Sequence, residues 1–322
     1  MKTAICCIAK CENRYLKEWV DYHLNLGFSH IYIWDNNNPD GEHIEEALPN
    51  YSQVTVLDCR GEKAFQNKAY TRFYKEYGKE YDWIAYIDVD EFITFSEESR
   101  LRTIDEFLNR YDAKVQIVHL NWMCYGDSGI VDSEGYSVLS RFKTPMEFEK
   151  KVKYDFPEND HVKSLYRGGL DPEELNIGPH TTSKGDFLVV DALGNPCDNS
   201  CFKPYDFSIA FIRHYVTKTL LEWIVKKSRG RVSVYSSSDY YSFDRFFMYN
   251  ERTKEKERII EYYDLFSKAL GESMNTDLML CRKKMDSLEK QFNHLRRDYQ
   301  VVINSKAYKL GKLIIRPFKI FK

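Results

Sequence analysis

Apolar runs alternate with amphipathic segments along the first ninety residues of the chain. Short, largely apolar runs predict buried strands at 3–9, 30–34, 54–57 and 82–87. Between them, residues 14–26 and 63–77 carry apolar side chains at helical spacing. Strands that alternate with helices in this order predict a mostly parallel sheet with right-handed crossover connections.

The pattern changes between about residues 95 and 215. Short apolar runs are separated there by loops that contain Gly, Pro and Asp, which predicts a mixed region added to the sheet. Helical periodicity returns over residues 217–270. We therefore expect one α/β domain over residues 1–270, with helices flanking a central sheet.

A heptad pattern follows this predicted domain. Nine consecutive seam positions, at alternating steps of four and three, are apolar: Met274, Leu278, Cys281, Met285, Leu288, Phe292, Leu295, Tyr299 and Val302. This pattern predicts a coiled-coil helix over residues 271–304 and a homo-oligomer. The alternative is one amphipathic helix that packs along its own domain.

The last segment, residues 305–322, alternates cations with large apolar side chains. From residue 280 onward the chain has twelve Lys or Arg and three acidic residues, although its net charge overall is −2. Such a basic amphipathic tail predicts association with an anionic membrane surface. A nucleic acid would attract the same charges, but the bulky aliphatic content favours lipid, so we expect no nucleic-acid partner.

Other features of the sequence indicate the compartment. No apolar run is long enough to span a bilayer, and residues 4–9 are too short for the apolar part of a signal peptide. The eight cysteines show no paired spacing like that of a zinc ribbon, which favours reduced thiols. We expect a cytoplasmic protein that is peripheral on the inner face of the plasma membrane.

Three carboxylates follow the fourth apolar run within four positions. Asp88 and Asp90 are two residues apart, so on a strand they would point to the same side, with Val89 facing the core. Hard oxygen ligands at the carboxyl end of a buried strand suit a divalent cation, Mn²⁺ or Mg²⁺. The alternative is an acidic strand end without chemistry.

These motifs resemble the GT-A-fold glycosyltransferases of family 92 and the family 2-like enzymes. The resemblance covers roughly residues 1–230, and its most specific blocks are the first and third of the matching segments at 9–27, 33–36, 82–92, 121–129 and 214–226. It implies a GT-A-like (Rossmann-like) mixed, mostly parallel sheet with a C-terminal helical extension. The tail of the chain also resembles the ends of bacterial surface-polysaccharide transferases.

The resemblance implies a metal-dependent transfer of a sugar from a nucleoside diphosphate donor, with a UDP-sugar expected. Asp90 would bind the metal, Asp88 would reach the donor ribose or a metal-bound water, and a neutral His214 would be a third metal ligand. Glu91 would either support the metal or end the strand. Further donor-side candidates are Lys10 and Arg14 near the diphosphate, Asp35 at the uracil or ribose, and Lys68. Asp35 could instead cap an Asx turn.

The acceptor is expected to be a saccharide or a lipid-linked saccharide in cell-surface polysaccharide synthesis. An inverting transferase needs a general base near the acceptor hydroxyl, and Asp127 is the candidate, followed by Asp132 and Glu134. Position 127 departs from the family pattern, in which a small residue is usual. A retaining outcome stays open. The acceptor-side candidates are Trp122, Tyr125 and His180.

Other classes of protein compete with this interpretation. A haloacid-dehalogenase phosphatase also has Asp-x-Asp after a strand, but its motif comes after the first strand and is not followed by Glu-Phe. A nucleotidyltransferase of related fold would need a glycine-rich phosphate loop near the N-terminus, which is absent here. A non-catalytic scaffold that presents the coiled coil and the tail is a third possibility, and the intact aspartates weigh against it.

Deletion of residues 305–322 tests the membrane prediction. We expect the deletion to abolish binding to anionic liposomes, because it removes six cations, each of which contributes about 1 kcal/mol near such a surface. Liposome co-sedimentation measures the binding, and donor hydrolysis should be unchanged. Liposome binding that survives the deletion would exclude the tail as the membrane-associating segment.

Overall fold

A computed structural model of the protein describes part of the chain. The described residues are 1–128, 130, 137–145, 158–180, 185–197, 201, 205–229, 246 and 249–250. The predicted coiled coil (271–304) and basic tail (305–322) lie outside the described residues, as do Asp132 and Glu134. Within the described part, no helix is both long and apolar enough to cross a membrane.

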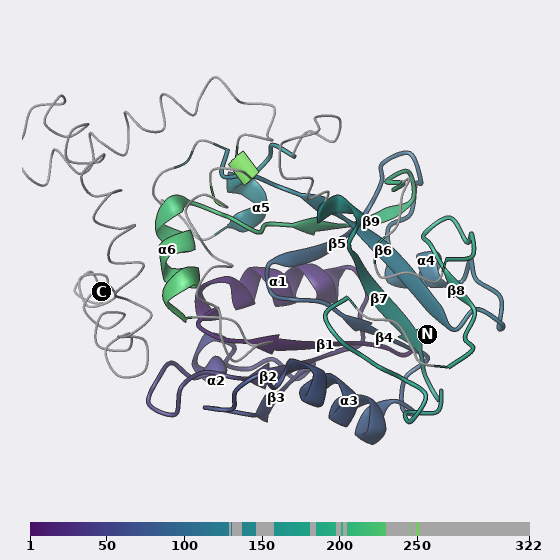
Figure 1. The fold of residues 1–322 in the computed structure, drawn as a ribbon, viewed down its shortest axis with the longest axis horizontal. Coiled ribbons are helices and arrows are strands. Elements are labelled where there is room, and N and C mark those ends of the chain that lie inside the picture. The colour runs from purple at the N-terminus through teal and green to yellow at the C-terminus, as the bar shows by residue number, and fades with distance from the viewer. Residues whose placement is uncertain are drawn as a thin grey trace, which may run out of the picture.

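The core of the fold is a sheet with the strand order β3-β2-β1-β4-β7-β6-β9-β5, and β8 pairs with β6 (Figure 1). Its first four strands in this order are parallel: β3 (Val54–Asp58), β2 (His30–Asp35), β1 (Thr3–Ala9) and β4 (Trp83–Tyr86). Their carboxyl ends therefore lie at one edge of the sheet. Ligands of open α/β sheets bind at such an edge.

Two helices cover opposite faces of these parallel strands (Figure 1). The side chains of β1 alternate between them: Ile5 and Cys7 belong to the core under α1 (Asn13–Asn25), and Ala4 and Cys6 belong to the core under α3 (Gln66–Tyr77). Because both faces are covered, all seven residues of β1 are buried. A parallel strand between two helical layers needs such a continuous apolar run.

The other half of the sheet is mixed. Strand β7 (Val162–Arg167) is antiparallel to both β4 and β6 (Ile117–Cys124). The first part of β6 pairs with β7, and its last three residues pair with β9 (Ala210–His214), which in turn pairs with β5 (Glu91–Phe95). The end of β6 thus joins β9 and β5 to the rest of the sheet.

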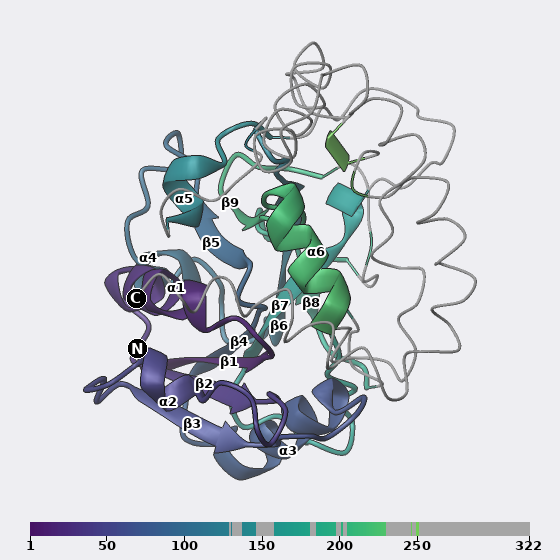
Figure 2. The same cartoon turned by 90° about the vertical axis from the view of Figure 1, so that its left-hand side faces the viewer.

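Short elements complete the described fold. They are α2 (Ile44–Ala47), α4 (Ile104–Leu108), α5 (Val138–Arg141), the 3₁₀ turn η1 (Glu158–Asp160), β8 (Val189–Val190) and α6 (Leu220–Arg229). Figure 2 looks onto the carboxyl edge of the sheet and shows α6 standing in front of it. Helix α6 follows β9 directly, so the chain brings both elements to this edge.

The predicted fold class is confirmed: the domain is mixed α/β with a mostly parallel sheet between helices. The strands and helices predicted in the first ninety residues all form. Within the middle region, residues 138–141 form the short helix α5. The Ser137 hydroxyl caps this helix by accepting a hydrogen bond from the Ser140 amide.

One buried carboxylate joins three helices. Both Glu222 oxygens on α6 accept hydrogen bonds from the Arg141 guanidinium of α5, each at 2.9 Å, and the Tyr15 hydroxyl of α1 donates at 2.7 Å. Burial by itself would raise the pKa of Glu222. The hydrogen bonds from Arg141 and the Thr219 amide nevertheless lower this pKa from 4.5 to about 2.

Replacing Glu222 by Gln should lower the free energy of unfolding near pH 7 by about 3 kcal/mol, because the substitution leaves Arg141 buried without its partner. A carboxyl whose pKa is depressed in the folded state stabilises the fold above its unfolded pKa. The difference from wild type should therefore shrink as the pH falls from 4.5 to about 2. Urea unfolding at several pH values measures it. The exposed Glu46→Gln should change little, and equal losses in both variants would contradict the assignment.

Candidate active site

The three carboxylates that follow β4 lie on a turn. Strand β4 ends at Tyr86 and β5 begins at Glu91, and the Glu91 amide donates to the Asp88 carbonyl at 3.0 Å. The sequence predicted that both aspartates extend from a strand toward one side. That prediction is wrong, because the chain reverses here and Asp88 and Asp90 have different partners.

Asp88 is held by side chains of α3 and β7. Its Oδ1 accepts hydrogen bonds from Gln66 Nε2 at 3.0 Å and Tyr70 Oη at 3.3 Å, and its Oδ2 accepts one from Lys163 Nζ at 2.7 Å. Lys163 also lies 3.3 Å from Glu91 Oε2. Burial alone would lower the pKa of Lys163, but Asp88 and Glu91 together raise it above its usual value. Lys163 is therefore a permanent cation between two carboxylates.

Asp90 faces two other lysines and a histidine. Lys226 Nζ of α6 donates to Asp90 Oδ2 at 2.6 Å, Lys218 Nζ lies 3.9 Å from the same oxygen, and His214 Nε2 lies 3.9 Å from Oδ1. Burial would raise the pKa of Asp90, but Lys226 and Lys218 hold it well below its usual value. Asp90 is consequently ionised although it is only 6% exposed.

His214 ends β9 and is buried beside Asp90. Burial lowers the pKa of its imidazole to about 3, and Asp90 opposes this effect only in part. The imidazole is therefore neutral at physiological pH and keeps a nitrogen lone pair, which is the form that binds metals. This agrees with the neutral His214 expected from the sequence.

Asp90, Glu91 and His214 fit a divalent cation. Their ligand atoms all lie within 4.8 Å of one another, and all three residues are buried. Glu91 Oε1 is a buried oxygen without a hydrogen-bond partner. Burial raises the pKa of Glu91 well above its usual value although Lys163 opposes this, and a bound cation would reverse the shift. Two carboxylates and an imidazole suit Mn²⁺.

This group differs from the sequence prediction in one residue. Asp88 is not in it, and its oxygens accept hydrogen bonds from Gln66, Tyr70 and Lys163. Glu91 is in the group, on the side of Asp90. The direct binding of a metal by Asp88 stays a prediction. A contact between Asp88 and the donor also stays a prediction.

Trp122 of β6 packs against His214 of the acidic centre and against two further histidines, His180 and His161. Its ring centroid lies 4.0 Å from that of His214, 4.6 Å from that of His180 and 5.2 Å from that of His161, on which it stacks. Trp122 Nε1 is buried without a hydrogen-bond partner. His180 Nδ1 lies 3.1 Å from the Val162 carbonyl. Burial lowers the pKa of His180 well below its usual value, which keeps it neutral.

The third acceptor-side candidate, Tyr125, and the candidate base, Asp127, have other partners. Tyr125 is buried against Tyr215, with ring centroids 4.9 Å apart, and its hydroxyl donates to Met123 Sδ at 3.5 Å. Asp127 is buried, and its amide donates to Asn250 Oδ1 at 2.7 Å. Its role as a general base stays a prediction.

The donor-side candidates are spread over the carboxyl edge and beyond it. Lys10 directly follows β1, and Arg14 Nη1 lies 3.9 Å from Glu222 Oε1. Lys68 is exposed on α3, and helical periodicity places it opposite the face that carries Gln66 and Tyr70. The structure therefore does not bring Lys68 to the acidic centre.

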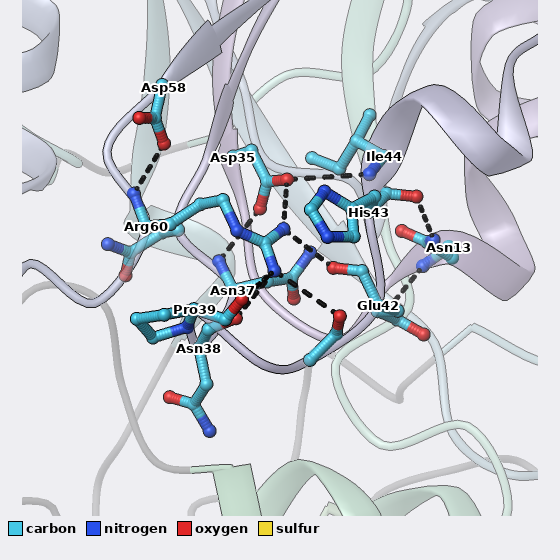
Figure 3. Close-up of polar contacts among 12 residues, drawn as sticks. Asn13, Asp35, Asn37, Asn38, Pro39, Glu42, His43, Ile44, Asp58 and Arg60 are labelled. Atoms are coloured by element: carbon cyan, nitrogen blue, oxygen red, sulfur yellow. Dashed lines mark hydrogen bonds and ion pairs between the residues drawn. The ribbon is translucent and has the colours of Figure 1, made fainter.

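Asp35 ends β2 and belongs to a network around Arg60, which Figure 3 shows. Arg60 Nη1 donates to Asp35 Oδ2 at 2.7 Å and to the Glu42 carbonyl at 2.9 Å, and Nη2 donates to the Asn38 carbonyl at 2.6 Å. The Asn37 amide donates to Asp35 Oδ1 at 2.9 Å, which is an Asx turn. Asp35 thus shapes the loop after β2, and its contact with a nucleotide stays a prediction.

Sequence reasoning missed the lysines as site residues. Lys163 interrupts the apolar run of β7 and is 1% exposed, and a charge within a buried strand signals a buried partner. Lys218 and Lys226 belong to the segment that resembled the family, but nothing in their spacing shows that they meet Asp90. Gln66 and Tyr70, which hydrogen-bond Asp88, carry no signal in the sequence that distinguishes them from other helix residues.

The fold and the site define an α/β protein with a buried acidic centre at the carboxyl edge of parallel strands. The sequence profile of Glycosyltransferase family 92 matches residues 2–268, and the chain belongs to this GT-A-like family. A glycosyltransferase family 92 protein of Oryza sativa subsp. japonica is 30% identical over 131 residues, which is 39% of this chain and 21% of that protein. One of Ricinus communis is 28% identical over 143 residues, or 42% and 25% of the two chains.

These matches span about a fifth to a quarter of the length of the two plant proteins. Among solved structures, that of S. aureus TarS 1-349 is similar with a TM-score of 0.37 and 14% identity, over 87% of this chain and 76% of that one.

Replacing Arg60 by Lys should loosen the loop after β2, because a single ammonium cannot replace the planar fork that reaches Asp35 and four carbonyls. We expect a loss of about 2 kcal/mol in the free energy of unfolding and faster hydrogen exchange in residues 36–43. Chemical unfolding and exchange mass spectrometry measure the two effects. The exposed Arg110→Lys is the control, and unchanged exchange in Arg60→Lys would refute the role of this network.

Proposed function

We propose that this protein is a metal-dependent glycosyltransferase that moves a sugar from a UDP-sugar to an acceptor hydroxyl. Its membership of Glycosyltransferase family 92 supports the reaction class. The observation that carries the proposal is the buried group of Asp90, Glu91 and His214 at the carboxyl edge of the sheet. A site of this composition suits the diphosphate of an activated sugar with a divalent cation, Mn²⁺ or Mg²⁺.

In this proposal Asp90 and His214 bind the cation directly, with Glu91 beside them. The cation would supply Lewis-acid stabilisation of the negative charge that grows on the diphosphate as the glycosidic bond breaks. Asp88, which Gln66 and Lys163 fix in position, would accept hydrogen bonds from the donor ribose or from a water. Loop residues near Asp35 and the cations Lys10 and Arg14 would lie on the nucleotide side.

The acceptor would lie on the side of Trp122. A sugar ring can stack on an indole or imidazole face, and Trp122 Nε1 can donate a hydrogen bond to a hydroxyl. We propose an inverting transfer in which a general base removes the acceptor proton as the bond to the anomeric carbon forms, with Asp127 as the candidate base. The acceptor class would be a saccharide or a lipid-linked saccharide of a cell-surface polysaccharide.

Two further parts of the proposal concern residues outside the described structure. The heptad segment 271–304 would form a homo-oligomer, and the basic tail 305–322 would hold the protein on the anionic cytoplasmic face of the plasma membrane. Together they would place the active site next to a lipid-linked acceptor.

Asp90→Asn tests the proposed activity. Hydrolysis of UDP-sugars in the presence of Mn²⁺ should fall by at least about 100-fold, because the substitution weakens the cation site that contributes several kcal/mol to the transition state. Release of UDP measures the rate, and circular dichroism checks that the variant folds. A panel of UDP-sugars identifies the donor in the same assay.

The matched control is Asp21→Asn, which removes an exposed partner of Lys17 on α1 and should leave the rate unchanged. A folded Asp90→Asn with wild-type hydrolysis would refute the metal role of Asp90. If the wild-type protein shows neither hydrolysis nor thermal stabilisation by UDP with Mn²⁺, the scaffold interpretation is favoured over the enzyme.

A further inference from the structure

The lysines around the acidic turn differ in how many carboxylate oxygens they contact. Lys163 has two carboxylates within 3.3 Å, those of Asp88 and Glu91. Lys218 and Lys226 instead share one oxygen, Asp90 Oδ2, at 3.9 and 2.6 Å. Two ammonium groups therefore face a single carboxylate oxygen.

Lys218 is buried beside an aromatic ring and a carboxylate. Its side chain is 4% exposed, and its distance to Asp90 is too long for a hydrogen bond. Its Nζ lies 4.6 Å from the centre of the Tyr15 ring. The backbone of Lys218 is left-handed, with φ of +54°, which a non-glycine residue adopts only where its surroundings impose it. Such strain is typical of functional positions.

Other carboxylates contribute to the charge balance around Lys218, and the charge of Glu12 supports its ammonium more strongly than that of Asp90 does. His214 is neutral, and Glu222 is engaged by Arg141. Burial is the main cause that lowers the pKa of Lys218, Lys226 acts in the same direction, and Glu12 and Asp90 oppose them. A ligand with more than one negative charge, such as a diphosphate, would match the two ammonium groups.

Lys226 engages one oxygen of a carboxylate that also belongs to the candidate cation site. Asp90 belongs to the group of buried cation ligands, and a short hydrogen bond from Lys226 engages its Oδ2. Lys226 also donates to the Val216 carbonyl at 3.0 Å. Its side chain is a flexible four-carbon stem on α6, so the ammonium can leave Asp90 while the helix stays in place.

We propose that Lys226 is an exchangeable counterion of Asp90 and that Lys226 and Lys218 together form the binding site for the diphosphate of the donor. Without donor, Lys226 competes with the divalent cation for Asp90. When a nucleoside diphosphate binds with its cation, Lys226 and Lys218 pass to the phosphate oxygens and Asp90 passes to the cation. The proposal rests on the proposed function and adds the residues that couple the binding of metal and nucleotide.

The test measures Mn²⁺ and UDP affinity separately in the full chain. For Lys226→Met, we expect Mn²⁺ alone to bind about tenfold more tightly, because its competitor is lost, and UDP in saturating Mn²⁺ to bind about tenfold more weakly, because a phosphate contact is lost. Electron paramagnetic resonance of free Mn²⁺ gives the first affinity and calorimetry gives the second. Lys226→Arg keeps the charge and should bind Mn²⁺ as the wild type does.

Lys218→Met separates the two roles. It should weaken UDP binding by about tenfold without the gain in Mn²⁺ affinity, because its ammonium does not hydrogen-bond Asp90. The exposed Lys75→Met, which loses only its pair with Glu173, should change neither affinity. Circular dichroism confirms that each variant is folded.

The outcomes distinguish this proposal from the proposed function. A wild-type protein that binds UDP with Mn²⁺, together with a folded Lys226→Met that changes neither affinity, would overturn the exchange and leave the transferase intact. A gain in Mn²⁺ affinity in Lys226→Arg as large as in Lys226→Met would also overturn it. A wild-type protein that binds neither Mn²⁺ nor UDP would overturn both.

Discussion

The structure of the candidate site depends on the compensation of buried carboxylates by lysines from distant parts of the chain. An ionised carboxylate cannot remain buried without a partner. Here Lys163 of β7 meets Asp88 and Glu91, and Lys226 of α6 meets Asp90. These contacts tie the turn after β4 to the antiparallel half of the sheet and to the helix at its edge. The turn, the strand and the helix therefore form one unit.

Such a network is a poor way to gain stability. The desolvation of several charges offsets most of their attraction, and a well-packed apolar core would be as stable. The network also contains Glu91, whose Oε1 has no partner, and Lys218, whose backbone is left-handed. These costs lie at the carboxyl edge of the parallel strands. Ligand sites of open α/β sheets lie at this edge, which supports a functional origin.

The site has two sides that differ in chemistry. On one side, carboxylates and lysines provide oxygen ligands for a cation and ammonium groups for phosphates. On the other side, Trp122 packs against the imidazole rings of His180 and His214, which burial keeps neutral. His214 belongs to both sides, because it lies near Asp90 and against Trp122. The pairing of β6 with β9 produces this junction, since it brings the ends of both strands together.

The sequence by itself determined the parallel half of the sheet, the helices on its faces and the presence of three carboxylates after its fourth strand. These features are local: an apolar run such as Thr3–Ala9 predicts its strand whatever its partners are. Only the tertiary structure decided the direction of Asp88 and Asp90, the inclusion of Glu91 and the lysine partners. Lys163 and Lys226 are 75 and 136 residues from the aspartates that they contact. No periodicity in a single sequence encodes a pairing over such a distance, because it arises only when the sheet closes and α6 docks against its edge.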